Sequence, residues 1–161
     1  MRLGALVALG VLFADQLVKA FVLRGGVGLP TPLAPFLTLT LRWNRGVSFS
    51  LLTQDSARGQ AVLLAFTLAA TAALAVWLWR CRTWPAAAGL GAIIGGALGN
   101  AIDRWSHGAV IDFLDLHLLG RHLFVFNVAD AAINVGVALL ILDFAFGSRA
   151  SQPEAGPETG R

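Results

Sequence analysis

The chain has 161 residues, of which 57% are hydrophobic and 13% are charged, about half the charged share of a typical soluble domain. The length suits one domain, and the formal net charge of +3 is small. This composition excludes most water-soluble globules and disordered chains, and the charge is too scattered for a surface that binds nucleic acid. We therefore expect a membrane protein, in which each charged residue needs an explanation.

Four apolar segments are long enough to cross a bilayer, which takes about 20 residues as a helix. The first segment carries Asp15 and Lys19 and lacks a convincing cleavage site of small residues, so we expect a retained helix and not a signal peptide. An even number of spans places both termini on one side of the membrane. The predicted spans are residues 3–23, 61–79, 84–102 and 123–146.

The segment between the first two predicted spans is not apolar enough to enter the membrane. Glycines and prolines between residues 25 and 35 exclude a helix there. Residues 36–43 alternate in part between apolar and polar side chains, which predicts a short strand in a small β-structure on the outer face. Residues 148–161 are rich in Ser, Pro, Glu and Gly and are predicted to be a disordered tail, which leaves residues 1–147 as one membrane domain.

Charge counts alone do not decide the orientation in the membrane. The short link between the second and third spans carries Arg80 and Arg82, and this density favours that side as the cytoplasmic one. Both termini would then be cytoplasmic. The tryptophans would form two belts, an inner one of Trp77, Trp79 and Trp84 and an outer one of Trp43 and Trp105.

The third span contains small residues at a spacing of four, namely Gly91, Gly95 and Gly99. Small residues at this spacing let a neighbouring helix approach closely. We interpret the series as a packing feature.

The polar residues of the spans follow helical spacing. Asp15 and Lys19 lie four apart and can form an ion pair within the first helix. Three polar residues share one face at the outer end of the third span, and the fourth span has a polar face of its own. These two sets are Asn100, Asp103 and Arg104, and Asn127, Asp130 and Asn134.

Four of the nine acidic residues fall between positions 103 and 130. Asp112 and Asp115 lie on the link between the third and fourth spans. Because these spans are antiparallel, we expect this link and the two polar faces to meet near the outer interface. The residues expected to converge there are Asn100, Asp103, Arg104, Asp112 and Asp130.

Two carboxylates in a confined site suit the chemistry of aspartic proteases, in which one is protonated and the other is ionised. Composition alone does not distinguish such a site from a proton or ion pathway. His107, His117 and His122 lack the spacing of metal ligands, and Cys81 is the single cysteine, so we expect neither a metal site nor an intrachain disulfide.

Five motifs, in order along the chain, closely resemble those of the bacterial lipoprotein signal peptidases (signal peptidase II). They are DQLVK at 15–19, NRGVSF at 44–49, GGALGNAIDR at 95–104, GAVIDF at 108–113 and FNVAD at 126–130. The departures from the family pattern are minor, with Ser48 where Ala is frequent and Phe124 and Ala131 where Pro and Ser are frequent. The resemblance implies an all-α membrane protein with four transmembrane helices, together with a small β-structure and a short loop or helix on the outer, periplasmic face.

The resemblance also implies roles for individual residues. Asp112 and Asp130 correspond to the family's catalytic pair. Residues that position the substrate, or the inhibitor globomycin, correspond to Asn44, Gly46, Asn100, Arg104 and Asn127, and supporting polar residues to Asp15, Lys19 and Asp103.

The implied reaction is removal of the signal peptide from a diacylglyceryl-modified prolipoprotein, just before the lipid-modified cysteine. It requires neither a metal nor a cofactor. The implied setting is the bacterial inner membrane, with the enzyme a monomer surrounded by membrane lipids.

Two other functions fit parts of the pattern. A membrane phosphotransferase that uses Mg²⁺ would need a denser array of acids. A small proton- or ion-conducting protein would distribute polar residues over the whole membrane depth. Asp115 and Asp143 have no assigned role, and we expect each to cap a helix or to lie at the interface.

Overall fold

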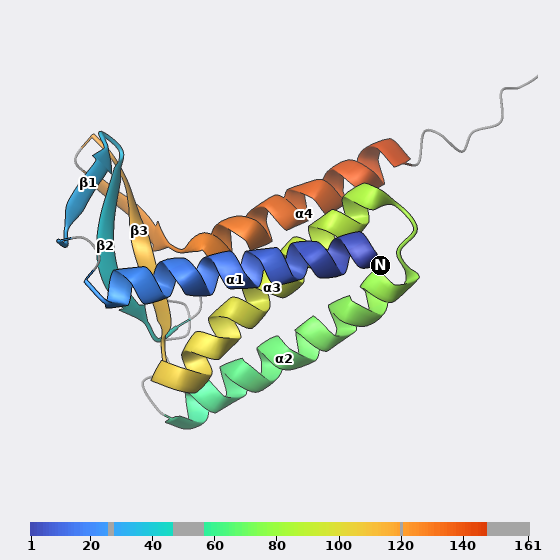
Figure 1. Ribbon diagram of the computed structural model, residues 1–161, viewed down its shortest axis with the longest axis horizontal. Coiled ribbons are helices and arrows are strands. Elements are labelled where there is room, and N and C mark those ends of the chain that lie inside the picture. The colour runs from blue at the N-terminus through green and yellow to red at the C-terminus, as the bar shows by residue number, and fades with distance from the viewer. Residues whose placement is uncertain (26–27, 47–56, 120, 148–161) are drawn as a thin grey trace, which may run out of the picture.

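The computed structural model describes residues 1–25, 28–46, 57–119 and 121–147. Four helices form a bundle, and a sheet stands at one end of it (Figure 1). The helices are α1 (Arg2–Leu23), α2 (Ala57–Arg80), α3 (Trp84–His107) and α4 (Val128–Gly147). All four are long and apolar enough to cross a membrane, which confirms the predicted number of apolar helices. The predicted tail and residues 47–49 of the second motif lie outside the described residues.

Helix α3 is the most buried of the four and lies at the centre of the bundle. Its glycines face two partners. Gly91 packs against the backbone of Gly4 in α1, and a Cβ built on Gly89 would lie 2.7 Å from the carbonyl oxygen of Gly136 in α4. The small residues therefore allow close packing of α1 and α4 against α3.

The sheet contains four antiparallel strands in the order β1-β2-β3-β4. The strands are β1 (Thr31–Ala34), β2 (Leu37–Asn44), β3 (Val110–Leu118) and β4 (Arg121–Phe126). Strand β2 confirms the predicted strand at 36–43 to within one residue. The amino terminus and the end of α4 lie at the opposite end of the bundle from the sheet (Figure 1).

From the sequence we assigned no secondary structure to the link between the third and fourth spans, and this link contains strand β3, which pairs with β2 on one side and β4 on the other. The predicted start of the fourth span at residue 123 is wrong. The fourth helix begins at Val128, and residues 123–126 belong to β4. A short apolar run cannot be assigned to helix or strand by hydropathy alone, and here pairing with β3 decides for a strand.

An apolar cluster joins the sheet to the bundle. Val22 near the end of α1 packs with Leu39 of β2 and with Ile111 and Phe113 of β3. Both β3 side chains are 1% exposed. Because Asp112 lies between them in the strand, this cluster fixes the position of that carboxylate relative to the helices.

Candidate active site

Asp112 lies on β3 and is 3% exposed. Its two carboxylate oxygens accept hydrogen bonds from different amide side chains. Asn127 Nδ2 donates to Oδ1 over 2.8 Å, and Asn44 Nδ2 donates to Oδ2 over 3.0 Å. Asn44 is itself fixed, because its Oδ1 accepts a hydrogen bond of 3.0 Å from the backbone N–H of Gly46. No cation is in contact with this carboxylate among the described residues.

Asp130 is the third residue of α4. Asn100 Nδ2 donates to its Oδ1 over 2.9 Å, and the backbone N–H of Asn127 donates to its Oδ2 over 3.2 Å. In return, the backbone N–H of Asp130 donates to Asn127 Oδ1 over 2.8 Å. This reciprocal pair is a capping box, which satisfies N–H groups that the first turn of a helix leaves free.

Asn127 therefore connects the two aspartates that the motifs select. Its side-chain Nδ2 donates a hydrogen bond to Asp112. Its backbone N–H donates to Asp130 Oδ2, and its side-chain Oδ1 accepts from the backbone N–H of Asp130. The same residue therefore caps the helix and connects the two carboxylates. As a result, the first turn of α4 presents Asp130 to β3 with little freedom.

Burial raises the pKa of Asp112 to about 6, and the neighbouring charge of Asp130 acts in the same direction. The hydrogen bonds from Asn44 and Asn127 oppose this change. A carboxyl group with this pKa exchanges its proton near neutral pH, which suits general acid and base catalysis.

A second polar cluster supports the first from the side of α1. Lys19 Nζ lies 2.7 Å from Asp15 Oδ2 and 2.7 Å from Asp103 Oδ2, and all three side chains are at most 2% exposed. The predicted Asp15–Lys19 pair is therefore present, with Asp103 as a third member. Lys19 also donates to Asn100 Oδ1 over 3.2 Å, which links this cluster to the residue that holds Asp130.

The carboxylates of the Lys19 cluster also fix the backbone next to the two candidate catalytic aspartates. Asp15 Oδ1 accepts from the N–H of Ala129, at the start of α4, over 2.9 Å. Asp103 Oδ2 accepts from the N–H of Ile111, directly before Asp112, over 3.1 Å. The cluster thus positions both candidate catalytic aspartates through their chain neighbours.

A pocket of about 190 Å³ lies beside this network. Asn44, Gly46, Asn100, Arg104 and Asp130 line it, together with apolar side chains of α3 and α4 and Thr67 of α2. Arg104 Nη2 donates to the carbonyl oxygen of Gly46 over 3.3 Å, while its buried Nε has no partner within the described part of the chain. Asp112 does not line the pocket, but Asn44, which donates to its Oδ2, does.

The family model for signal peptidase (SPase) II matches residues 7–146. The chain belongs to the signal peptidase II family. Two curated relatives, both called lipoprotein signal peptidase, support this membership. The one from Rhodopseudomonas palustris (strain ATCC BAA-98 / CGA009) is 44% identical over 94% of this chain and 96% of its own length, and the one from Beijerinckia indica is 47% identical over 88% and 86%.

Two solved structures of bacterial membrane enzymes share this fold. One bacterial membrane enzyme, solved by the in meso method at 2.3 Å, superposes with a TM-score of 0.81 and 25% identity over 96% of this chain and 94% of its own. A second, at 1.9 Å, gives a TM-score of 0.76 with 26% identity over 91% and 94%. The protein is therefore a peptidase of this family and a multi-pass membrane protein.

Within this signal peptidase II framework, the structure brings together the five residues that we expected to converge. Asn134 does not join them. It is exposed on α4, and its Nδ2 donates to the backbone oxygen of Asp130 over 3.0 Å. Asn127, expected inside the fourth helix, instead precedes it as the cap.

Our sequence reasoning missed Gln16. Its Nε2 lies within 3.2 to 3.3 Å of Asp15 Oδ2, Asp103 Oδ1 and the carbonyl oxygen of Gly99, so it donates to both carboxylates of the Lys19 cluster. The signal was present in the sequence, since an amide inside a predicted span has to find partners.

Proposed function

We propose that the protein is an aspartic endopeptidase that removes the signal peptide from diacylglyceryl-modified prolipoproteins, cleaving just before the lipid-modified cysteine. Membership of the signal peptidase II family supports the reaction class. The observation that carries the proposal is the attachment of Asp112 and Asp130 to the same residue, Asn127, beside a pocket at the end of the spans.

In the proposed reaction, one aspartate of the pair is ionised and the other is protonated. The ionised carboxylate takes a proton from a water molecule, which attacks the carbonyl carbon of the scissile bond. The protonated carboxyl group donates to the carbonyl oxygen, and the amine of the cysteine leaves with a proton from the pair. This sequence needs no metal or cofactor.

The pocket-lining residues hold the peptide in this proposal. Asn44, Gly46 and Asn100 offer amide and backbone groups to the substrate backbone, and Arg104 offers its guanidinium group to the carbonyl oxygens. Asn127, which is buried, contributes to substrate positioning through the two aspartates that it holds. Because Asn44 lies against Asp112, it has to turn aside for water to reach that carboxylate. Asn44 therefore acts as a movable clamp. Asp15, Lys19 and Asp103 are positioning residues.

We place the protein in the bacterial inner membrane as a monomer, with both termini cytoplasmic and the site near the outer face. The amino terminus, the end of α4 and the link with Arg80 and Arg82 all lie at the end away from the sheet, and clustered arginines favour the cytoplasmic side (Figure 1). The lipid of the substrate then stays in the bilayer while its peptide bond reaches the pocket. Globomycin is expected to occupy the same pocket.

The test is processing of a purified lipid-modified prolipoprotein by the full chain in detergent, followed by gel shift and mass spectrometry. The expected products are a free signal peptide and a protein that begins at the modified cysteine. EDTA is expected to leave the rate unchanged, whereas a Mg²⁺ phosphotransferase would lose its activity. No cleavage of the lipidated substrate, or cleavage at another bond, would overturn the proposal.

A further inference from the structure

A second polar pocket lies in the sheet and has no part in the proposed reaction. Its volume is about 430 Å³. The strands β2, β3 and β4 contribute its polar side chains, which are Thr38, Thr40, Arg42, Asp115, His117 and His122. None of these residues lines the pocket beside Asp130.

Asp115 is the buried acid of this pocket, with 4% of the residue exposed. Its Oδ2 accepts a hydrogen bond of 2.7 Å from Nδ1 of His122. Its Oδ1 is buried and has no hydrogen-bond partner in the part of the chain that the structure describes. A buried carboxylate oxygen without a donor is costly, so a bound group that brings a donor to this atom would be stabilised. Of the two positions expected for Asp115, helix capping is wrong because the residue lies in a strand, whereas a position at the interface stays a prediction.

The other side chains of the pocket limit the chemical class of the bound group. A hydrogen bond of 2.9 Å joins the side chains of Thr38 and His117 and fixes one wall of the pocket. Arg42 contributes an exposed guanidinium group. The pocket therefore offers a buried acceptor with negative charge and a cation nearer to solvent. A ligand with an ammonium group close to a phosphate matches both.

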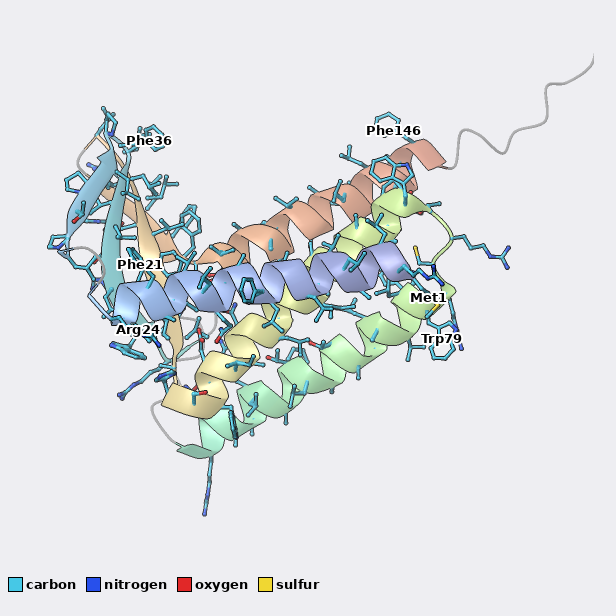
Figure 2. The ribbon with its side chains drawn as sticks, in the orientation of Figure 1. Met1, Phe21, Arg24, Phe36, Trp79 and Phe146 are labelled. Carbon is cyan, nitrogen blue, oxygen red and sulfur yellow. The ribbon has the colours of Figure 1, made fainter. Side chains whose placement is uncertain are left out.

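Three exposed apolar residues are neighbours of pocket residues in the sheet. Phe36, Leu118 and Leu123 are 53%, 58% and 55% exposed. They are close to the pocket, since the N–H of His117 donates to the carbonyl oxygen of Phe36 over 3.0 Å and His122 precedes Leu123 in β4. Figure 2 shows Phe36 at the corner of the sheet that projects beyond the helices. Exposed apolar side chains at the end of a membrane-spanning bundle suit contact with lipid, and this arrangement favours a pocket at the depth of the headgroups.

We propose that this pocket binds the phosphoethanolamine headgroup of a membrane phospholipid. The ammonium group of this headgroup donates a hydrogen bond to Asp115 Oδ1, and the phosphate group of the same headgroup forms an ion pair with Arg42. The acyl chains lie along Phe36, Leu118 and Leu123. A choline headgroup carries no N–H, so it cannot satisfy Asp115.

The test uses the full chain in detergent micelles with isotope-labelled histidine. The chain has three histidines, and two of them line the pocket. The third, His107, lies against Trp43 at the end of α3 and serves as an internal control. Dihexanoyl phosphatidylethanolamine is expected to shift the imidazole signals of His117 and His122 in a saturable way. The imidazole signal of His107 is expected to stay unchanged. The choline lipid of equal chain length is expected to give no saturable shift.

Variants and a soluble probe complete the experiment. Asp115→Asn is expected to weaken the response to the ethanolamine lipid about tenfold or more, whereas Asp143→Asn, on α4, is expected to leave it unchanged. Free phosphoethanolamine is expected to produce the same shift only at much higher concentration. Equal responses to the two lipids, or binding of free phosphoethanolamine as tight as that of the lipid, would overturn the proposal; both comparisons use the unaltered chain.

Discussion

Two acidic clusters lie side by side at the same end of the bundle, and they are stabilised differently. In the first, Lys19 lies between Asp15 and Asp103, so a cation offsets the buried carboxylates. In the second, Asp112 and Asp130 accept hydrogen bonds from amide groups alone. An amide stabilises a carboxylate less than a contacting cation does. The first cluster is therefore suited to hold the structure, and the second to exchange protons.

The largest effect is expected from removing the cation of the first cluster. Lys19→Met leaves two buried carboxylates without their partner, which is expected to cost about 3–5 kcal/mol of stability. The measurement is the free energy of unfolding in detergent. Arg24→Met, at the exposed end of α1, is the matched control and is expected to change it by about 0.5 kcal/mol at most. Equal effects of the two variants would show that the Lys19 cluster has no special structural role.

The residue shared by the two aspartates is expected to affect activity more than stability. Asn127→Ala removes the donor to Asp112, to Asn100 Oδ1 and to the backbone oxygen of Ile111, together with one half of the capping box. We therefore expect kcat to fall about 100-fold and stability to fall by about 2 kcal/mol. Asn134→Ala, on the exposed side of α4, is expected to retain both. The check is the initial rate of prolipoprotein cleavage together with thermal unfolding. An active Asn127→Ala variant would remove the distinction between the clusters.

The close packing of α3 against the Lys19 cluster is testable at one glycine. A Cβ at Gly99 would lie 2.5 Å from Asp15 Oδ2, whereas a Cβ at Gly10 has no atom within 4 Å. Gly99→Ala is expected to lower stability by about 1–3 kcal/mol, because the buried carboxylate has to shift. Gly10→Ala, by contrast, is expected to stabilise α1 slightly. Similar unfolding midpoints for the two variants would argue against this packing.

The smallest expected effect is a gain of stability in the second cluster. The pKa of Asp112 is about 6 in the folded protein and 3.8 ordinarily, so the folded state binds the proton more tightly. The stability that this proton binding provides is therefore present below about pH 4 and is lost as the pH rises through about 6. Ionised Asp112 then costs at most about 3 kcal/mol.

Asp112→Asn removes that cost but also loses a hydrogen bond, so at pH 7.5 the variant is expected to be more stable by about 1 kcal/mol. The advantage is expected to disappear near pH 4, where the wild-type carboxyl group is protonated. Thermal unfolding of both proteins at the two pH values measures this. A variant that is less stable at pH 7.5 would mean that the amide donors fully compensate the carboxylate.

The sequence predicted which polar residues come together better than it predicted the elements that carry them. Charge is expensive in a membrane, so the few polar residues of the spans were informative, and the Asp15–Lys19 pair follows from a spacing of four. The sequence did not predict the strands that contain Asp112 and Leu123, because their apolar runs resemble the end of a helix. Only the antiparallel pairing of β3 with β4 distinguishes these strands from a helix. The capping box at Asn127 depends on where α4 begins, which the apolar pattern placed five residues too early. Asp115 required the sheet register, since its partner His122 lies on a neighbouring strand.

The most direct measurement of the central claim is the cleavage rate of a lipid-modified prolipoprotein by Asp112→Asn, by Asp130→Asn and by the double variant. Because the two carboxyl groups act as one unit, each single variant is expected to lose activity by about three orders of magnitude or more, and the double variant is expected to lose little further. Asp143→Asn is expected to cleave normally and shows that the preparation is competent. Full cleavage by either single variant would contradict the assignment of Asp112 and Asp130 as the catalytic pair.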